Sequence, residues 1–167
     1  MNVRYLDPLY EECQLGGKYI KTDAIAKQIL ECDVYINLPC LKHHGATEVS
    51  VGIKNQLGVS WDRQQHHRAG RDSAPDNLHQ NIADLAAVVR PTLVVIDATW
   101  ALKTNGPKGP GEVEETNTII VSHDIVTADA LGAQLLRHEP LDIAHIRMAK
   151  DAGLGSADLP ELEIARV

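Results

Sequence analysis

Apolar runs of strand length alternate with amphipathic segments along this chain. Residues 33–38, 92–97 and 116–121 are short and apolar, as buried strands are, and residues 162–165 form a further candidate strand. Between them, apolar residues recur at helical spacing, which predicts helices at residues 22–31, 45–58, 77–90, 124–137 and 141–152. Because helices alternate with strands, the pattern predicts a single α/β domain over residues 1–167, with helices on the faces of a mostly parallel sheet.

The predicted helix at residues 45–58 carries two stripes. Its apolar positions fall within an arc of about 80° when successive residues are placed about 100° apart, and they are Ala46, Val49, Ile53 and Leu57. A second, polar stripe beside it contains Thr47, Ser50 and Lys54. The first stripe predicts a core-facing side, and the second predicts a polar side on which Lys54 lies.

Glycine-rich and polar segments predict turns and loops. Gly16-Gly17 predicts a turn between two short extended pieces, and residues 59–76 are polar and irregular. Residues 104–111 contain three Gly and two Pro, which forbid regular structure. Long loops in compact domains are commonly lids or binding loops, so both segments are candidates for ligand contacts.

Composition and charge narrow the classes of function. The chain is 44% hydrophobic with a net charge of -7 and has no Lys/Arg cluster, so we expect no nucleic-acid binding. We also expect no membrane span, because no apolar run approaches the ~20 residues required. Met1 is followed by no basic-then-apolar signal, which predicts a cytoplasmic protein. The three cysteines include no C-x-x-C pair, so this chain alone is not expected to hold an iron–sulfur cluster.

The first candidate site follows the strand at residues 33–38. Cys40, Lys42, His43 and His44 come at the carboxyl edge of the predicted sheet, where ligands bind in parallel sheets. Cys40 with His43 or His44 could supply half of a site for a divalent metal ion. Lys42 could instead attract a small anion. The competing interpretation is a hydrated loop with capping side chains.

A second group of candidates lies on the two helices that follow. Lys54 is placed on one side with the histidine pair, and Asn55 follows it. A buried lysine can have a lowered pKa and act as a base or nucleophile. His79 lies in the first turn of the helix at residues 77–90, beside the long loop. The competing interpretation is that Lys54 is a surface lysine and that the histidines face water.

Two carboxylates and a glycine loop complete the candidates. Asp97 ends a strand, and the loop after it could bring backbone close to a ligand at Gly106, Gly109 and Gly111. Asp129 lies in a mostly apolar helix, where a carboxylate is costly unless it is paired, so we expect it to support Lys54 or a histidine. Alternatively, Asp97 caps a loop and Asp129 occupies the exposed face of its helix.

These pieces occur in an order that resembles the family called domain of unknown function 362. The run from Asp33 to His43 is similar to its strand and Lys-x-His turn, with either His43 or His44 as the family histidine. The run Lys54-Asn55-Gln56-Leu57-Gly58 resembles its Lys-Asn-x-x-Gly helix end. Further elements follow in family order: His79 with Asp84-Leu85, Pro91 to Asp97, Asn105 to Gly111, Ser122-x-Asp124 and Asp129. The resemblance covers about residues 30–158.

The resemblance implies a fold more than a function. It implies that N-terminal strands of the full family domain are missing, so the chain would be a C-terminal portion or would associate with a partner or a second copy. Many relatives also carry a ferredoxin-like cluster domain or an export signal, and this chain shows neither.

Three hypotheses about function follow. The first is an enzyme whose Lys, His and Asp side chains converge at the sheet edge on a small anionic ligand or a metal ion. The second is a redox accessory protein that works beside an iron–sulfur partner. The third is a non-catalytic fragment that requires association.

Overall fold

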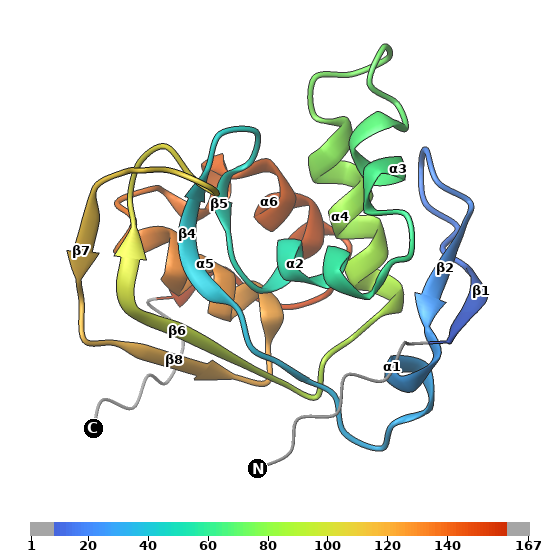
Figure 1. Cartoon of the computed structure of the whole chain (residues 1–167), viewed down its shortest axis with the longest axis horizontal. Helices are drawn as coiled ribbons and strands as arrows, with labels where there is room; N and C mark the ends of the chain where they lie inside the picture. The colour runs from blue at the N-terminus through green and yellow to red at the C-terminus, as the bar shows by residue number, and fades with distance from the viewer. Residues whose placement is uncertain (1–8, 160–167) are drawn as a thin grey trace.

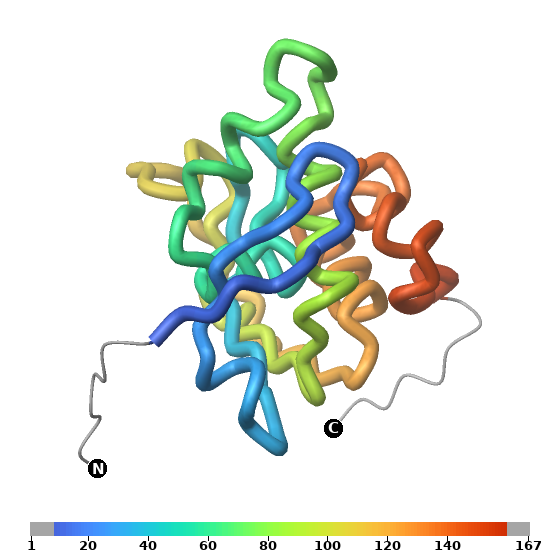
Figure 2. The backbone as a smooth tube through the Cα atoms, turned by 90° about the vertical axis from the view of Figure 1, so that its right-hand side faces the viewer, coloured from blue at the N-terminus to red at the C-terminus, as the bar shows by residue number. Residues whose placement is uncertain are grey.

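The computed structural model describes residues 9–159, and its first element is a separate hairpin. Strands β1 (Tyr10–Gln14) and β2 (Thr22–Ala26) pair antiparallel. The turn between them contains Gly16 at a φ of 61°, a left-handed conformation that glycine adopts without steric cost. The predicted turn at Gly16-Gly17 is therefore confirmed. Figures 1 and 2 show this hairpin in blue, beside α3 and α4.

The larger sheet is organised around one long strand. Strand β6 (Leu93–Leu102) pairs in parallel with β3 (Ile36–Asn37) and β4 (Cys40–His44) along one edge. Its other edge pairs antiparallel with β7 (Val113–Glu115) and β8 (Ile119–Ser122). Strand β5 (Glu48–Ser50) pairs antiparallel with β4 and completes the six strands that the described residues supply.

Helices cover the inner face of this sheet. Along β6, Val94, Ile96 and Ala98 are buried, and they face α2 (Gly52–Asn55) and α5 (Ile125–Leu135). Helices α4 (Asn77–Val88) and α6 (Ala144–Asp151) pack against each other and extend this layer. Figure 1 shows the layer beside and behind the strands. The predicted fold is thereby confirmed: an α/β domain with a parallel sheet centre formed by β3, β6 and β4.

Several predicted elements are confirmed with small shifts of their ends. Helices α4, α5 and α6 and strand β8 lie where the pattern placed them. Strand β6 continues to Leu102, so Asp97 lies in the middle of the strand and does not end it as predicted. Asp124 caps α5 as predicted, because its carboxylate accepts the N–H groups of Val126 at 2.8 Å and Thr127 at 2.9 Å. The candidate strand at residues 162–165 lies outside the described residues.

The predicted helix at residues 45–58 is wrong over its first half. Residues Glu48–Ser50 form strand β5, and only α2 and the short 3-10 helix Gln56–Val59 that follows are helical. The chain reverses after His44 through a turn at residues 45–47, and Glu48, the first residue of β5, has a φ of 54°. Val49 and Ile53 are buried as the apolar stripe predicted, but one lies on a strand and the other on a helix.

Three other segments also differ from prediction. Residues Thr22–Ala26 are strand β2, so only α1 (Lys27–Glu31) of the predicted first helix is helical. The predicted strand at residues 33–38 is reduced to β3. The polar segment 59–76 contains a short helix, α3 (Arg63–Arg68), because Asp62 accepts the N–H groups of its first turn.

Candidate functional site

Lys54 is a buried lysine on a very short helix. Its side chain belongs to α2, and the residue is only 7% exposed. Four residues cannot sustain a helix by themselves, so α2 depends on contacts from outside. The carboxylate of Asp129 on α5 accepts the N–H groups of Gly52 at 2.7 Å and Ile53 at 3.0 Å. Asp129 therefore fixes the N-terminus of α2 and, through it, the position of Lys54.

Asn55 fixes the other end of this helix. Its side-chain amide donates to the side-chain oxygen Oδ1 of Asn37 at 2.7 Å, and the side-chain amide of Asn37 donates to the backbone carbonyl of Gly52 at 2.9 Å. Together these bonds tie α2 to strand β3. The structure thus places Asp129 and Asn55 as supports of the helix that carries Lys54, and neither forms a hydrogen bond with the Lys54 ammonium within residues 9–159.

The charge of Lys54 is poorly compensated. Burial, followed by the positive charge of Lys42, lowers the pKa of Lys54 to about 8. No carboxylate lies within ion-pair distance of its ammonium in the part of the chain that the structure describes. Burying an ammonium without a counter-ion is costly, so this position favours either a neutral amine or a bound anion.

Four imidazoles surround this lysine. They come from the end of β4, from α3, and from the first turns of α4 and α6, and they are His44, His67, His79 and His145. Burial is the largest cause that lowers the pKa of each, and the charge of Lys54 lowers all four further. For His44 the result is a pKa of about 4. We call these four histidines with Lys42 and Lys54 the Lys54 cluster.

His79 and His145 form a buried pair within this cluster. The Nδ1 atom of His79 accepts the backbone N–H of His145 at 3.1 Å and lies 3.1 Å from the Nδ1 atom of His145. This network assigns the His79 proton to Nε2, which faces Glu48 at 3.9 Å, and makes the His145 Nδ1 atom a donor. The Nε2 atom of His145 is then a buried acceptor without a hydrogen-bond partner among the described residues.

The predicted metal ligands are not gathered around one point. The Nδ1 atom of His43 accepts the backbone N–H of Gly106 at 3.0 Å, whereas His44 joins the Lys54 cluster. Cys40 is exposed and pairs with Asp97 across the sheet. Among residues 9–159, no three His, Cys, Asp or Glu side chains come close enough together to hold a metal ion.

Asp97 and the glycine loop also lie apart from Lys54. Asp97 is exposed on the outer face of the sheet, and the Thr99 backbone N–H, at 2.9 Å, holds the pKa of its carboxyl below the usual range. A Cβ atom added to Gly106 would lie 1.9 Å from the His43 carbonyl oxygen, and one added to Gly111 would lie 1.9 Å from that of Thr104. One added to Gly109 would lie 2.7 Å from the Gly111 nitrogen, so packing within the loop and against β4 accounts for these glycines.

The site predicted from the sequence leaves out two members of the cluster. His145 had one detectable signal, because it lies between Ala144 and Ile146 in a helix whose neighbouring positions are apolar. His67 could not be told apart from His66, which instead binds the Asp23 carboxylate at 2.8 Å and helps to attach the hairpin to α3. Only the three-dimensional fold separates these two adjacent histidines.

No helix within residues 9–159 combines the length and the apolar character that a membrane span requires. The chain is 28% identical over 149 residues to the thylakoid-associated protein sll1697 of Synechocystis sp.. That match covers 83% of this chain and 45% of the relative, so the chain spans about half the length of the relative it matches. No solved structure is significantly similar to it.

The sequence profile described as Domain of unknown function (DUF362) matches residues 3–134. The match begins before the hairpin and ends within α5, so it includes Lys54 and the residues that fix its helix. The order of motifs in the sequence had indicated the same family, and this chain belongs to the DUF362 family.

Proposed function

We propose that this domain binds a small organic or inorganic anion at the Lys54 cluster, and that Lys54 exchanges a proton with the bound molecule. The observation that carries the proposal is a lysine only 7% exposed, with no carboxylate partner within residues 9–159. An anion would supply the missing counter-charge. Lys42 adds a second positive charge, close enough to Lys54 to lower its pKa.

The protonation states of the cluster suit proton transfer near neutral pH. With a pKa of about 8, Lys54 is mostly a cation at pH 7 and mostly a neutral amine at pH 9. With a pKa of about 4, His44 is a neutral imidazole throughout this range. Groups whose environments separate their pKa values in this way commonly share acid and base roles. The unpartnered Nε2 atom of His145 is a further acceptor in the cluster.

The affinity for an anion should fall as the pH rises through about 8, because only the ammonium form of Lys54 attracts it. Isothermal titration with phosphate, sulfate, oxalate and malonate between pH 6 and 9.5 measures this directly. Lys54→Met should weaken binding about 10- to 100-fold, the range expected for losing a charged hydrogen bond.

Two variants control this experiment. Lys54→Arg keeps a positive charge that does not titrate, so weak binding should persist without the change near pH 8. Lys27→Met removes a lysine that pairs with Glu31 on the surface of α1, and binding should be unchanged. The proposal is overturned if none of these anions binds at any pH, or if Lys54→Met binds them as well as the unaltered chain does.

The place in the cell is a separate part of the proposal. We propose a cytoplasmic location for this domain. The name of the Synechocystis relative associates that protein with the thylakoid. Fractionation of cells into soluble and membrane fractions tests the proposal, and recovery of the chain with the membranes after a salt wash would reject it.

A further inference from the structure

The outer face of the larger sheet is largely apolar, and no element within residues 9–159 covers it. Residues alternate along β6, so that Val94 and Ile96 are buried inward while Val95 and Asp97 point outward. Strands β3 and β8 and the connection after β3 add aliphatic side chains with high exposed fractions, namely Ile36 at 46%, Leu38 at 68%, Ile119 at 64% and Val121 at 59%. Parallel strands such as β3, β4 and β6 are normally covered on both faces, so this exposure is unusual.

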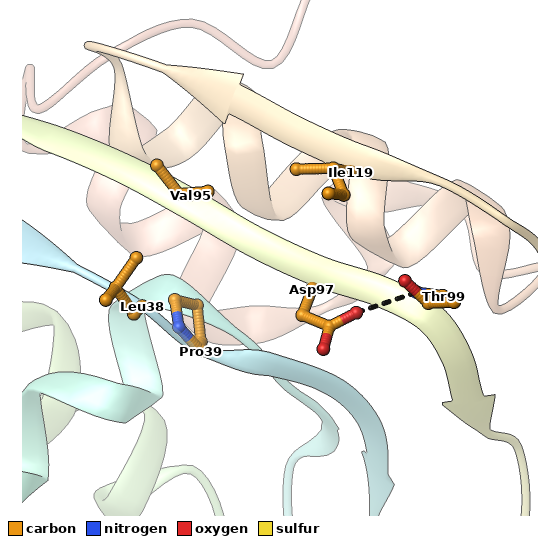
Figure 3. Close-up of a pocket in the computed structure, with 6 residues that line it drawn as sticks. All are labelled: Leu38, Pro39, Val95, Asp97, Thr99 and Ile119. Carbon is orange, nitrogen blue, oxygen red and sulfur yellow. Dashed lines mark hydrogen bonds between the residues drawn. The ribbon is translucent and has the colours of Figure 1, made fainter. Parts of the chain in front are cut away.

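A shallow hollow of about 240 Å³ lies in this face. Figure 3 shows its lining from the connection between β3 and β4, from β6 and from β8: Leu38, Pro39, Val95, Asp97, Thr99 and Ile119. The hollow combines aliphatic walls with a single charge, the Asp97 carboxylate, which is held by the Thr99 backbone N–H at 2.9 Å. None of the six lining residues is basic, and Asp97 forms no ion pair with any described residue.

The charge of Asp97 defines what can cover this face. A purely apolar layer would bury a carboxylate without a counter-ion, which is costly. Two copies of this chain stacked face to face would bury two such carboxylates, because the residues that line the hollow offer no cation in return. A complementary surface must therefore combine aliphatic side chains with one cationic group placed opposite Asp97.

We infer that the outer face of the sheet is a docking surface for an amphipathic α-helix of a partner protein. The helix would carry an aliphatic stripe that packs on Val95, Leu38 and Ile119, and one Arg or Lys within the stripe that pairs with Asp97. Helices are the elements that cover parallel sheets, and an arginine can bind a carboxylate through two parallel hydrogen bonds. This surface is separate from the Lys54 cluster, so the inference does not depend on the proposed function.

Three synthetic helical peptides test this inference. They share one leucine and isoleucine stripe and differ at its central position, which is Arg, Gln or Glu. A compensating substitution on the polar face keeps their net charge equal, so that the net charge of -7 on the chain cannot produce a difference. Fluorescence anisotropy with the full chain should give the order Arg, Gln, Glu from tightest to weakest, with at least about tenfold between Arg and Glu.

Substitutions on the chain separate the two contributions to binding. Asp97→Asn should abolish the preference among the peptides while leaving their common affinity. Ile119→Lys should abolish binding of all three, whereas Val88→Lys, at an exposed apolar position of α4, should have no effect. Circular dichroism checks that each variant is folded.

Four results would overturn the inference. The first two are that no peptide binds and that the unaltered chain binds all three peptides equally. The third is a dimer of the chain alone that Ile119→Lys dissociates. The fourth is binding to neutral lipid vesicles that the same substitution abolishes. The dimer would assign the face to a second copy of the chain, and the vesicle result would assign it to a membrane surface.

Discussion

The sequence suggested Asp129 as part of a catalytic site, whereas in the structure its carboxylate holds the short helix α2 in place. The sequence indicated only that a carboxylate in an apolar helix needs a partner, and the structure supplies one in the two N–H groups of α2. The need for a partner could be predicted from the residue itself. Its identity could not, because the N–H groups lie 76 and 77 residues earlier in the chain.

Asp129→Ala should lower the free energy of unfolding by about 2–6 kcal/mol, because it leaves two buried N–H donors without an acceptor at about 1–3 kcal/mol each. Urea denaturation measures this loss. Asp33→Ala removes an exposed carboxylate and should change stability by less than about 0.5 kcal/mol. Equal stability of the two variants would show that Asp129 does not hold α2.

The pH dependence of stability tests the environment of Asp129 independently. Burial raises the pKa of Asp129 from 3.8 to about 7, despite its two N–H donors. Because the folded-state pKa is raised, this carboxyl stabilises the fold fully below about pH 3.8 and loses that contribution as the pH rises through about 7. The difference in unfolding free energy between the unaltered chain and Asp129→Asn should shrink over this window. A constant difference would mean that Asp129 titrates normally.

At the scale of elements, the local spacing of apolar residues predicted the long helices correctly. It failed where pairing between strands determines the structure. Helix α4 has a complete apolar stripe and lies as predicted. The segment 45–58 has an equally regular stripe, yet its first half pairs with β4, because strand pairing and burial override helical spacing. The position of Lys54 on a polar side could be predicted, but its burial between α3, α4 and β4 depends on that pairing.

His79 should act as the N-terminal cap of α6, although it belongs to α4. No side chain of α6 caps that helix, and the His79 Nδ1 atom accepts its second N–H group. His79→Ala should lower the unfolding free energy by about 1–3 kcal/mol and speed hydrogen exchange in the first turn of α6. His79→Asn should restore part of both. Unchanged exchange rates at His145 and Ile146 in His79→Ala would contradict this role.

At the scale of the whole molecule, the Lys54 cluster should make the fold sensitive to acid. The four imidazoles of the cluster have lowered pKa values, so each stabilises the fold above the unfolded value of 6.5 and loses that contribution as the pH falls. The positive charges of Lys42 and Lys54 contribute to the lowered pKa of His44, whereas Glu48 and Asp76 raise the pKa of His79. Asp129 has a raised pKa and therefore opposes the trend, as one group against four. The free energy of unfolding should therefore fall between about pH 6.5 and pH 4.

The double variant His44→Gln/His67→Gln should flatten this decline, because neither amide can take up a proton. Urea denaturation at a series of pH values measures the slope for both proteins. His123→Gln replaces an exposed histidine outside the cluster and should leave the slope unchanged. An equal slope in the double variant would assign the acid sensitivity to other groups.

The overall architecture followed from the order of strands and helices, whereas the composition of the site did not. Of the lysine, histidine and aspartate side chains that the sequence suggested for one site, the structure places Lys42, Lys54, His44 and His79 in the Lys54 cluster. Asp97 lies on the opposite face of the sheet. Sequence spacing places a residue near a strand end, but the twist of the sheet and the pairing of β4 decide which face it reaches.

The pairing of β6 has a consequence for synthesis. Its first neighbours, β3 and β4, precede it along the chain, whereas the synthesis of β7 and β8 is complete only at residue 122. At about 5–20 residues per second, one side of the nascent strand keeps open N–H and C=O groups for about one to four seconds. Such an open edge is a template for pairing with another nascent chain. Pairing of residues 113–122 with β6 closes that edge. A ribosome that pauses shortly before this segment would therefore prolong the interval in which the open edge can pair with a neighbouring nascent chain.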